Sequence, residues 1–275
     1  MDSAREVEEI EICLLLEAIL RRYGYDFRDY APASLKRRIL KCMRDENLST
    51  LSGLQERVLH DPACMKRFLN TLTVDVTALF RDPGFYLAFR RHVVPLLRTY
   101  AGFRVWHAGC ASGEEVYSMA ILLREEGILQ KARIYATDLN EDLVNKAKEG
   151  IFPLSRMKEY TRNYQAAGGK GSLSDYYVAR YDNAIMEPSM KENLTFAVHN
   201  LACDGSFNEF HVVLCRNVMI YFNRKLQERV HRLLYESLGY LGTLAVGSKE
   251  SLKFTPHETD YDAVDESEKI YRKVR

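Results

Sequence analysis

A glycine-rich turn beside an acidic side chain is the first segment whose residue types could do chemistry. Gly109-Cys-Ala-Ser-Gly113 stands between an apolar, strand-like run and a helical segment. Glycines in such a turn let the backbone approach a ligand closely, so Gly109 and Gly113 are candidate cofactor-binding positions. The spacing is GxxxG, not the GxGxxG that cradles a pyrophosphate. Glu115, just after the turn, would also repel a phosphate.

Two acids near this turn each have a structural and a functional interpretation. Ser112 and Glu115 can form a capping box at the start of the helix, or the Glu115 carboxylate can hold a polar group of a ligand. Asp138 ends the next strand, where an acid typically accepts hydrogen bonds from ribose hydroxyls. Asn140 can cap the following helix, so we favour the ribose function for Asp138. Together the two acids fit a nucleoside without a phosphate, such as S-adenosylmethionine (SAM) with its cationic sulfonium.

A third polar pair follows a very apolar strand. Arg216 and Asn217 come directly after His211-Val-Val-Leu-Cys215, and polar groups at the end of a buried strand must find partners. These partners are either a ligand or a structural network. The continuation Asn217-Val-Met-Ile-Tyr221 is not the Pro-Pro-Tyr type of motif expected in enzymes that methylate base amino groups.

Alternating strands and helices after residue 100 must position these side chains. Apolar runs at 103–108, 133–137, 195–199, 212–215 and 241–246 alternate with helical segments, which predicts an α/β fold with a parallel, doubly wound sheet. Ligands bind such sheets beyond the carboxyl ends of the strands. Asp82 and Pro83 predict a helix start, with the aspartate as N-cap. Residues 151–194 break the alternation, and we expect a small inserted antiparallel sheet there.

The first seventy residues contain helical patterns only. Apolar residues at helical spacing predict the first helix (Val7, Ile10, Leu14, Leu15 and Ala18). We expect an all-helical domain over residues 1–72, followed by a second domain over 73–275. The helix after Pro32 is basic, with Arg37, Lys41 and Arg44 on one face and Arg38 beside them. Such a charge run is either a solvated face or a docking surface.

Composition excludes several classes of protein. The 275 residues carry 39 Lys plus Arg and 38 Asp plus Glu, a net charge of +1, and 47% are hydrophobic. These values exclude wholesale disorder and argue against a general nucleic-acid coat. Six scattered cysteines predict neither a zinc site nor a disulfide framework. The acidic N-terminus is unlike a secretory signal, and Glu17 interrupts the short apolar run near it. We expect a cytoplasmic protein with reduced thiols, no metal and no membrane insertion.

Taken together, the motifs closely resemble those of the chemotaxis receptor glutamate methyltransferases of the CheR type. The matching segments run in order along the chain, at residues 76–82, 106–118, 136–140, 146–151, 200–201, 214–222 and 247–251. The resemblance implies a small all-α domain before a Rossmann-like class I methyltransferase domain with an inserted β-subdomain. It also implies methyl transfer from SAM to glutamate side chains of chemoreceptors, for sensory adaptation. The products would be glutamate methyl esters and S-adenosylhomocysteine.

The resemblance assigns roles residue by residue. Cofactor contacts would fall on Asp75, Thr77, Arg81, Glu115, Asp138, Asn200, Leu201, Arg216 and Asn217. Arg81 and Tyr221 would lie beside the reacting methyl group. The basic helix with Arg37, Arg38, Lys41 and Arg44 would dock on acidic receptor helices, and the insertion is where some members bind a receptor's C-terminal peptide. Asp75 is a departure, since asparagine is common there.

The implied chemistry needs no general base. A glutamate carboxylate, with an ordinary pKa near 4.3, is already the nucleophile at neutral pH. Arg81 would orient that carboxylate, and Tyr221 would donate a hydrogen bond or present its ring to the sulfonium. Without the family, a packed aromatic is the simpler interpretation of Tyr221. We expect a monomer without a nucleic-acid partner. The alternatives are a SAM-binding regulatory module and a methyltransferase acting on another signalling protein, a small molecule or a nucleic acid.

Overall fold

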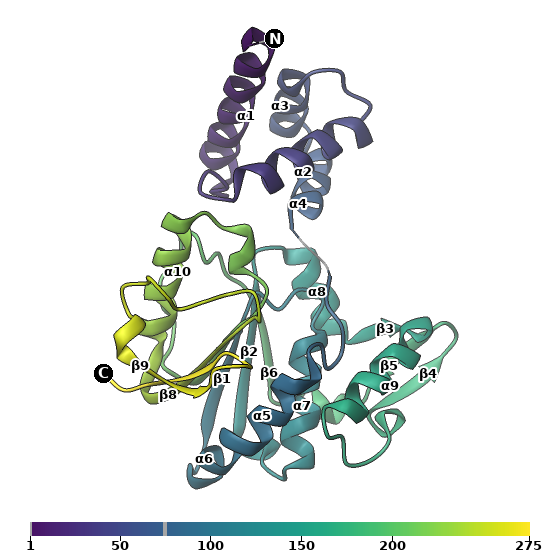
Figure 1. Cartoon of the computed structure of the whole chain (residues 1–275). Coiled ribbons are helices and arrows are strands. Elements are labelled where there is room, and N and C mark those ends of the chain that lie inside the picture. The colour runs from purple at the N-terminus through teal and green to yellow at the C-terminus, as the bar shows by residue number, and fades with distance from the viewer. Residues whose placement is uncertain (1, 74–75) are drawn as a thin grey trace. The chain divides into compact units, whose positions relative to one another are not determined.

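The computed structural model describes residues 2–73 and 76–275, which divide into two compact units (Figure 1). The first unit comprises Met1–Val74 together with two later segments, Asn200–Asp204 and Ile220–Val230. The second comprises Asp75–His199, Gly205–Met219 and His231–Arg275. The helical patterns of the first seventy residues did not indicate the two later segments, because these segments belong to the first unit through tertiary contacts alone.

Helices alone make up the N-terminal part of the first unit. They are α1 (Asp2–Tyr23), α2 (Pro32–Asp45), α3 (Leu51–His60) and α4 (Pro62–Leu72). The side chains of Thr50 and Asp61 cap α3 and α4, accepting hydrogen bonds from backbone N–H groups in the first turn of each helix. These four helices match the predicted segments closely.

The apolar residues whose spacing predicts α1 are not all buried. Val7, Ile10 and Leu14 are each about half exposed, whereas Leu15 and Ile19 are fully buried. The reason is that α1 packs on α3 through the face carrying Leu15, Leu16 and Ile19. Helical spacing identified an amphipathic helix correctly, but it could not distinguish two adjacent apolar stripes on that helix.

The second unit is built on a mixed seven-stranded sheet. Its order is β6 (Leu194–Val198), β2 (Ala132–Asp138), β1 (Phe103–Ala108), β7 (Phe210–Cys215), β8 (Leu238–Val246), β10 (Ile270–Lys273) and β9 (Tyr261–Asp265). The neighbouring strands from β6 to β8 pair in parallel, as predicted. β10 runs antiparallel to both of its neighbours, and the alternation of strands and helices had not predicted this.

The strand order places a switch point between β1 and β7. From β1 the chain passes to β2 and β6 on one side, and it then returns to β7 and β8 on the other side. The helices are α5 (Pro83–His92), α6 (Val94–Thr99), α7 (Glu114–Glu125), α8 (Glu141–Glu149) and α10 (Arg224–Ser237). In Figure 1, α5 and α7 cover one face of the sheet. The carboxyl ends of β1 and β7 therefore form the edge where ligands bind such folds.

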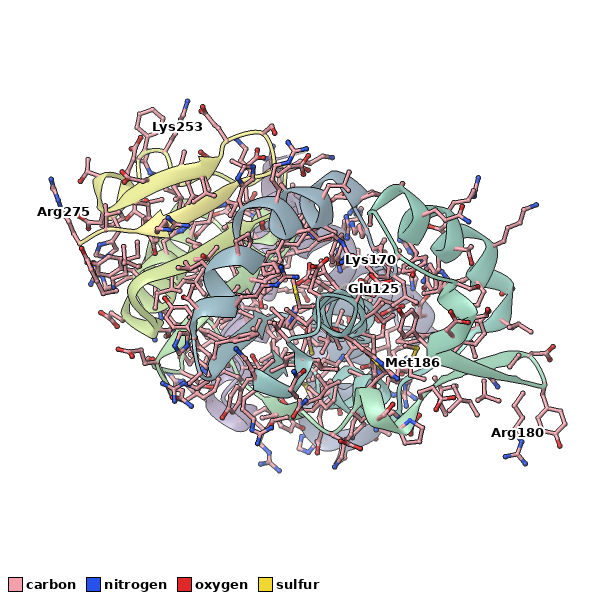
Figure 2. All side chains as sticks on the ribbon, turned by 90° about the horizontal axis from the view of Figure 1, so that it is seen from below. Glu125, Lys170, Arg180, Met186, Lys253 and Arg275 are labelled. Atoms are coloured by element: carbon pink, nitrogen blue, oxygen red, sulfur yellow. The ribbon has the colours of Figure 1, made fainter. Side chains whose placement is uncertain are left out.

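The insertion contains the expected small antiparallel sheet. β3 (Ile151–Pro153), β5 (Asn183–Met186) and β4 (Tyr177–Arg180) pair in that order, and α9 (Met157–Ala166) lies between β3 and β4 in the chain. Figure 2 shows Arg180 at the outer tip of the β4–β5 hairpin, pointing away from Glu125 and Met186. Within residues 2–73 and 76–275, no helix is both long enough and apolar enough to cross a membrane.

Candidate functional site

The glycine turn after β1 is held against the end of β2. The N–H groups of Gly109 and Cys110 both donate to the carbonyl oxygen of Thr137, at 2.8 and 2.9 Å. Gly109 has a φ of +85°, and a Cβ atom there would lie 2.5 Å from a methyl group of Val218. Glycine is therefore required at 109 both by the backbone conformation and by the close approach of the loop after β7.

Gly113, not Ser112, is the N-cap residue of α7, so the predicted capping box is wrong. The Ser112 hydroxyl donates to the Glu114 carboxylate at 2.7 Å. A Cβ atom on Gly113 would lie 2.8 Å from the Cβ atom of Ala147, so glycine lets α7 begin close against α8. The carboxylate of Glu115 instead pairs with side chains of β1 and of the loop after β7.

The Glu115 carboxylate lies between a histidine and an arginine. Its Oε1 atom is 2.9 Å from His107 Nδ1, and its Oε2 atom accepts from Arg216 Nη1 at 3.0 Å. Burial opposes ionisation of Glu115, but the His107 hydrogen bond and the Arg216 charge together hold its pKa below the ordinary value. The acid at the switch point is therefore ionised at neutral pH.

Arg216 joins two acids at the end of β7. Its side chain is only 2% exposed, and its Nη2 atom donates to Asp82 Oδ2 at 3.0 Å. The guanidinium carbon lies 4.0 Å from the centre of the Phe85 ring. Burial works against the charge, but the surrounding acids, Glu115 first, raise the pKa of Arg216. Asp82 occupies the predicted N-cap position of α5, but its side chain makes no capping bond because it pairs with Arg216.

Asp138 organises the glycine turn from the end of β2. Its Oδ2 atom accepts from the N–H of Ala111 at 2.9 Å, and its Oδ1 atom accepts from the N–H of Asn140 at 3.0 Å. The side chain of Asn140 caps α8 by accepting from the N–H of Asp142, as predicted. Asp138 is thus not needed as a helix cap, and its carboxylate lies beside the turn where a ribose would be held.

A buried glutamate holds the loop that contains Asn217. Glu250 Oε1 accepts from the N–H groups of Val218 and Met219, at 2.9 and 2.7 Å. Its Oε2 atom accepts from the N–H groups of Asn217 and Gly247, at 2.9 and 2.5 Å. Burial raises the pKa of Glu250 even against these donors. The carboxylate therefore ties the loop after β7 to the loop after β8.

Strained backbone is concentrated around this edge of the sheet. Four non-glycine residues here have a positive φ: Phe80 (52°), Asp82 (56°), Ala111 (47°) and Asn217 (62°). Such conformations cost free energy and persist only where the surrounding packing enforces them. In this unit three side chains stabilise these conformations: Asp138 and Glu250 through hydrogen bonds, and Asp82 through its ion pair.

The segment before α5 contains three predicted site residues. Arg81 Nη1 donates to the carbonyl oxygen of Val76 at 2.8 Å. The carbonyl oxygen of Thr77 accepts from Arg156 Nη2, also at 2.8 Å, which connects this segment to the insertion. The predicted contact at Asp75 lies outside the described residues. Thr77 and Arg81 belong to the second unit, as does Arg216, and the roles of Thr77 and Arg81 stay predictions.

Three predicted site residues lie in the first unit. The N–H of Asn200 donates to Asp204 Oδ2 at 2.7 Å, and the neighbouring Leu201 is buried. The carbonyl oxygen of Tyr221 accepts from the N–H of Ala31 at 2.8 Å. The roles of these residues stay predictions.

The basic helix α2 presents only part of the predicted docking set. Arg37, Lys41 and Arg44 are exposed. Arg38 is half-buried, because its Nη1 atom donates to the carbonyl oxygen of Leu72 at 2.9 Å and its guanidinium lies 5.2 Å from the centre of the Tyr221 ring. Arg38 therefore helps to hold the helical unit together, and its predicted docking role stays a prediction.

Three residues of the site were missed by sequence reasoning: His107, Asp82 and Glu250. Asp82 was interpreted only as a helix cap, and Glu250 was noted only within a matching segment. His107 lies inside a strand, where nothing in the sequence separates it from a core residue. What these residues share is a partner distant in sequence, and no local pattern encodes such a partner.

The arrangement can bind a zwitterionic nucleoside. Fixed charges of both signs meet at the switch point, in Arg216, Glu115 and Asp82, and the carboxylate of Asp138 lies at the end of β2. These features and the sheet order define a Rossmann-like, nucleoside-binding unit of the kind that methyltransferases use.

Family comparisons identify the chain more closely. Residues 75–269 match the CheR methyltransferase SAM-binding domain, and residues 10–73 match the CheR methyltransferase all-α domain. The chain belongs to the CheR methyltransferase family, which confirms the resemblance seen in the sequence. It is a SAM-dependent methyltransferase.

Relatives from three bacteria agree with this assignment. Cher3 of Pseudomonas putida is 51% identical over 273 residues, which is 99% of this chain and 100% of that protein. The chemotaxis protein methyltransferase of Listeria monocytogenes is 28% identical over 236 residues, 85% of this chain and 87% of that protein. That of Salmonella typhimurium is 28% identical over 247 residues, 86% of this chain and 82% of that protein.

Proposed function

We propose that this chain transfers the methyl group of SAM to glutamate side chains of chemoreceptors, giving glutamate methyl esters and S-adenosylhomocysteine for sensory adaptation. The observation that carries the proposal is the buried Arg216 paired with Glu115 and Asp82 at the switch point, in a chain that matches both domains of the family. The names of the relatives from Listeria and Salmonella support the acceptor. Residues 1–72 would act mainly in receptor binding and 73–275 in methyl transfer.

The residues of the site fit SAM by charge and position. Asp138 would accept hydrogen bonds from the ribose hydroxyls, because it ends β2 beside the glycine turn. Glu115 and Arg216 would hold the charged amino-acid end of the cofactor. The backbone at Gly109 and Gly113 would allow close approach, and Asp75, Thr77, Arg81, Asn200, Leu201 and Asn217 would complete the contacts. When bound, SAM supplies a methyl group made electrophilic by the sulfonium.

The protein's part in the reaction is to orient and desolvate an acceptor carboxylate. Glutamate is ionised at neutral pH and needs no base. Orientation behind the methyl–sulfur bond can supply several kcal/mol of the barrier. Arg81 would hold the carboxylate in one plane, since a guanidinium offers two parallel donors. Tyr221 would donate a hydrogen bond or face the sulfonium with its ring.

The acceptor would dock through charge. Arg37, Lys41 and Arg44 form an exposed basic face on α2 that suits an acidic receptor helix, although Lys41 also pairs with Asp45 at 2.6 Å. Attraction of this kind weakens with salt. The edge strand β4 also offers unpaired backbone groups to an extended receptor peptide. We propose a cytoplasmic monomer, as cytoplasmic receptor helices require.

A methyl-transfer assay tests the proposal. The chain is mixed with SAM labelled in its methyl group and with membranes bearing the host's chemoreceptors. We expect label in protein, release of that label as methanol by mild base, and loss of transfer in Arg81→Ala and Tyr221→Phe with folding unchanged. Charge reversal at Arg37 and Lys41 should reduce receptor methylation more than SAM binding. SAM binding without transfer to any receptor would favour a regulatory module instead.

A further inference from the structure

A loop with an exposed aromatic side chain emerges beside the candidate site. β8 runs parallel to β7, and their last residues, Val246 and Cys215, are register partners. The chain after β8 therefore emerges at the same edge of the sheet as Arg216 and Asn217. We call residues 251–257 the Phe254 loop. It follows Glu250 directly, and Glu250 binds the site loop through backbone N–H groups of Asn217, Val218 and Met219.

The Phe254 loop is anchored at both ends. At its start, the side chain of Leu252 is buried. At its end, the ring of His257 stacks on the ring of Tyr235, with centroids 3.8 Å apart and planes within 4°. The N–H of Phe254 donates to Glu258 Oε2 at 2.7 Å. These contacts attach both ends of the loop to the second unit.

What this loop presents to solvent is apolar and basic. The Phe254 side chain is 80% exposed, with a backbone φ of 63° that a bulky residue rarely adopts. Lys249 and Lys253 both precede it in the chain, and both are exposed. Figure 2 shows Lys253 projecting at the margin of the structure. An exposed aromatic side chain preceded by two lysines suits an acidic partner, because aromatic residues are enriched in binding hot spots and complementary charge favours association.

We propose that the Phe254 loop is a docking surface for the acceptor helix, on the same edge of the sheet as the methyl-transfer site. Phe254 packs against an apolar side chain of that helix, while Lys249 and Lys253 face acids that flank the modified glutamate. This inference rests on the proposed function, because it takes the acceptor to be an acidic helix. Attachment of the loop at both ends lowers the entropy lost on docking.

The molecule contains matched controls. Tyr240 is also exposed, at 72%, but it lies near the amino end of β8, at the opposite edge of the sheet. Lys148 is exposed in the last turn of α8, the helix that runs back from the site edge after β2. Tyr240→Ala and Lys148→Glu therefore change the same residue types away from the site.

The experiment compares Phe254→Ala and the double variant Lys249→Glu/Lys253→Glu with the two controls. Methyl transfer is measured against a cytoplasmic receptor fragment that the wild-type chain methylates, and SAM affinity is measured by calorimetry. We expect the acceptor KM to rise about fivefold in Phe254→Ala, with kcat and the SAM Kd within about twofold of wild type. Phe254→Trp should restore the acceptor KM. The double variant should show a weaker dependence of KM on salt.

Several outcomes decide between the explanations. An acceptor KM in Phe254→Ala no higher than in Tyr240→Ala overturns the docking role. A weakened SAM Kd in Phe254→Ala also overturns it, since the loop would then act by supporting Glu250. Concentration-dependent self-association that only Phe254→Ala abolishes would assign the loop to a second copy of the chain. If the wild-type chain methylates no receptor, the proposed function itself fails. This result differs from failure of the docking role, because it is seen without any change at Phe254.

Discussion

Two buried charge clusters in the second unit differ in how fully they are paired. At the root of the insertion, Arg90 of α5 binds the carboxylates of both Glu125 and Glu126. Glu125 also accepts from the hydroxyl groups of Tyr164 and Tyr176 and from the N–H of Lys170. Figure 2 shows Glu125 and Lys170 side by side.

The cluster at the switch point is less complete. Arg216 has two carboxylate partners, but within the described part of the chain neither Arg216 Nε nor His107 Nε2 has a hydrogen-bond partner. Asp82 is 39% exposed. Buried polar atoms usually find partners, and exceptions call for a reason. The comparison teaches that the two clusters differ in pairing: the carboxylates at the insertion root have many partners, whereas the switch-point cluster leaves two buried nitrogens without one among the described residues. We infer that the first serves stability and the second serves ligand binding.

Replacing the central arginine of each cluster should produce the largest and most different effects. Arg216→Met leaves Glu115 and Asp82 without their cation, so we expect roughly 100-fold weaker SAM binding and methyl transfer near background. Arg90→Met should instead lower the free energy of unfolding by about 3 kcal/mol, because buried Glu125 loses its cation. Calorimetry with SAM and urea unfolding measure the two effects. Equal loss of affinity in both folded variants would contradict the division of roles.

Glu250 tests whether the site loops depend on one carboxylate. In Glu250→Gln an NH2 group replaces one acceptor oxygen and faces backbone donors, so buried N–H groups lose their partner. We expect a loss of about 2 kcal/mol in the free energy of unfolding and weaker SAM binding. Glu258→Gln is the matched control, because Glu258 is exposed and accepts one backbone N–H, that of Phe254. If Glu258→Gln lowered the free energy of unfolding as much as Glu250→Gln, the burial of Glu250 would be shown to be unimportant.

His107 allows a test of the switch-point cluster with a smaller expected effect than Arg216. We infer that it positions Glu115, so His107→Leu should weaken SAM binding about tenfold, through loss of the hydrogen bond to a charged group. The side-chain nitrogen of Asn corresponds to Nδ1 of His, so His107→Asn should recover most of the affinity. Calorimetry at matched folded fractions measures this. Equal SAM affinity in the Leu and Asn variants would mean that His107 only fills space.

A buried nitrogen without a partner does not by itself indicate the switch-point site. His231 lies in α10, outside that cluster, and its Nδ1 atom also has no partner in the described chain. Burial lowers the pKa of His231 to about 4. The unfolded chain therefore binds more protons between about pH 6.5 and 4, and His231 makes stability fall as the pH falls through that window. At about pH 5.5 the loss should be about 1 kcal/mol relative to neutral pH. His231→Leu should remove this loss of stability, which urea unfolding at the two pH values measures. If the pH dependence of stability were unchanged in His231→Leu, the assignment to His231 would be contradicted.

Local signals were sufficient for much of the fold. Asn140 caps α8 as predicted, because an N-cap bond spans only two residues. The parallel strands and the inserted sheet followed from apolar runs and the breaks between them. The antiparallel β10 did not, because its direction is set by pairing with β8 and β9 and not by its own sequence.

The sequence by itself determined the family, the cofactor class and the helices and strands, because these depend on motifs and periodicities read along the chain. Only the tertiary structure decided what each side chain does. It turned Glu115 and Asp82 from predicted caps into partners of Arg216, it turned Arg38 toward Tyr221, and it left Val7, Ile10 and Leu14 half exposed. The physical reason is that a polar or apolar group takes its most favourable partner, and across a switch point that partner can be 134 residues away.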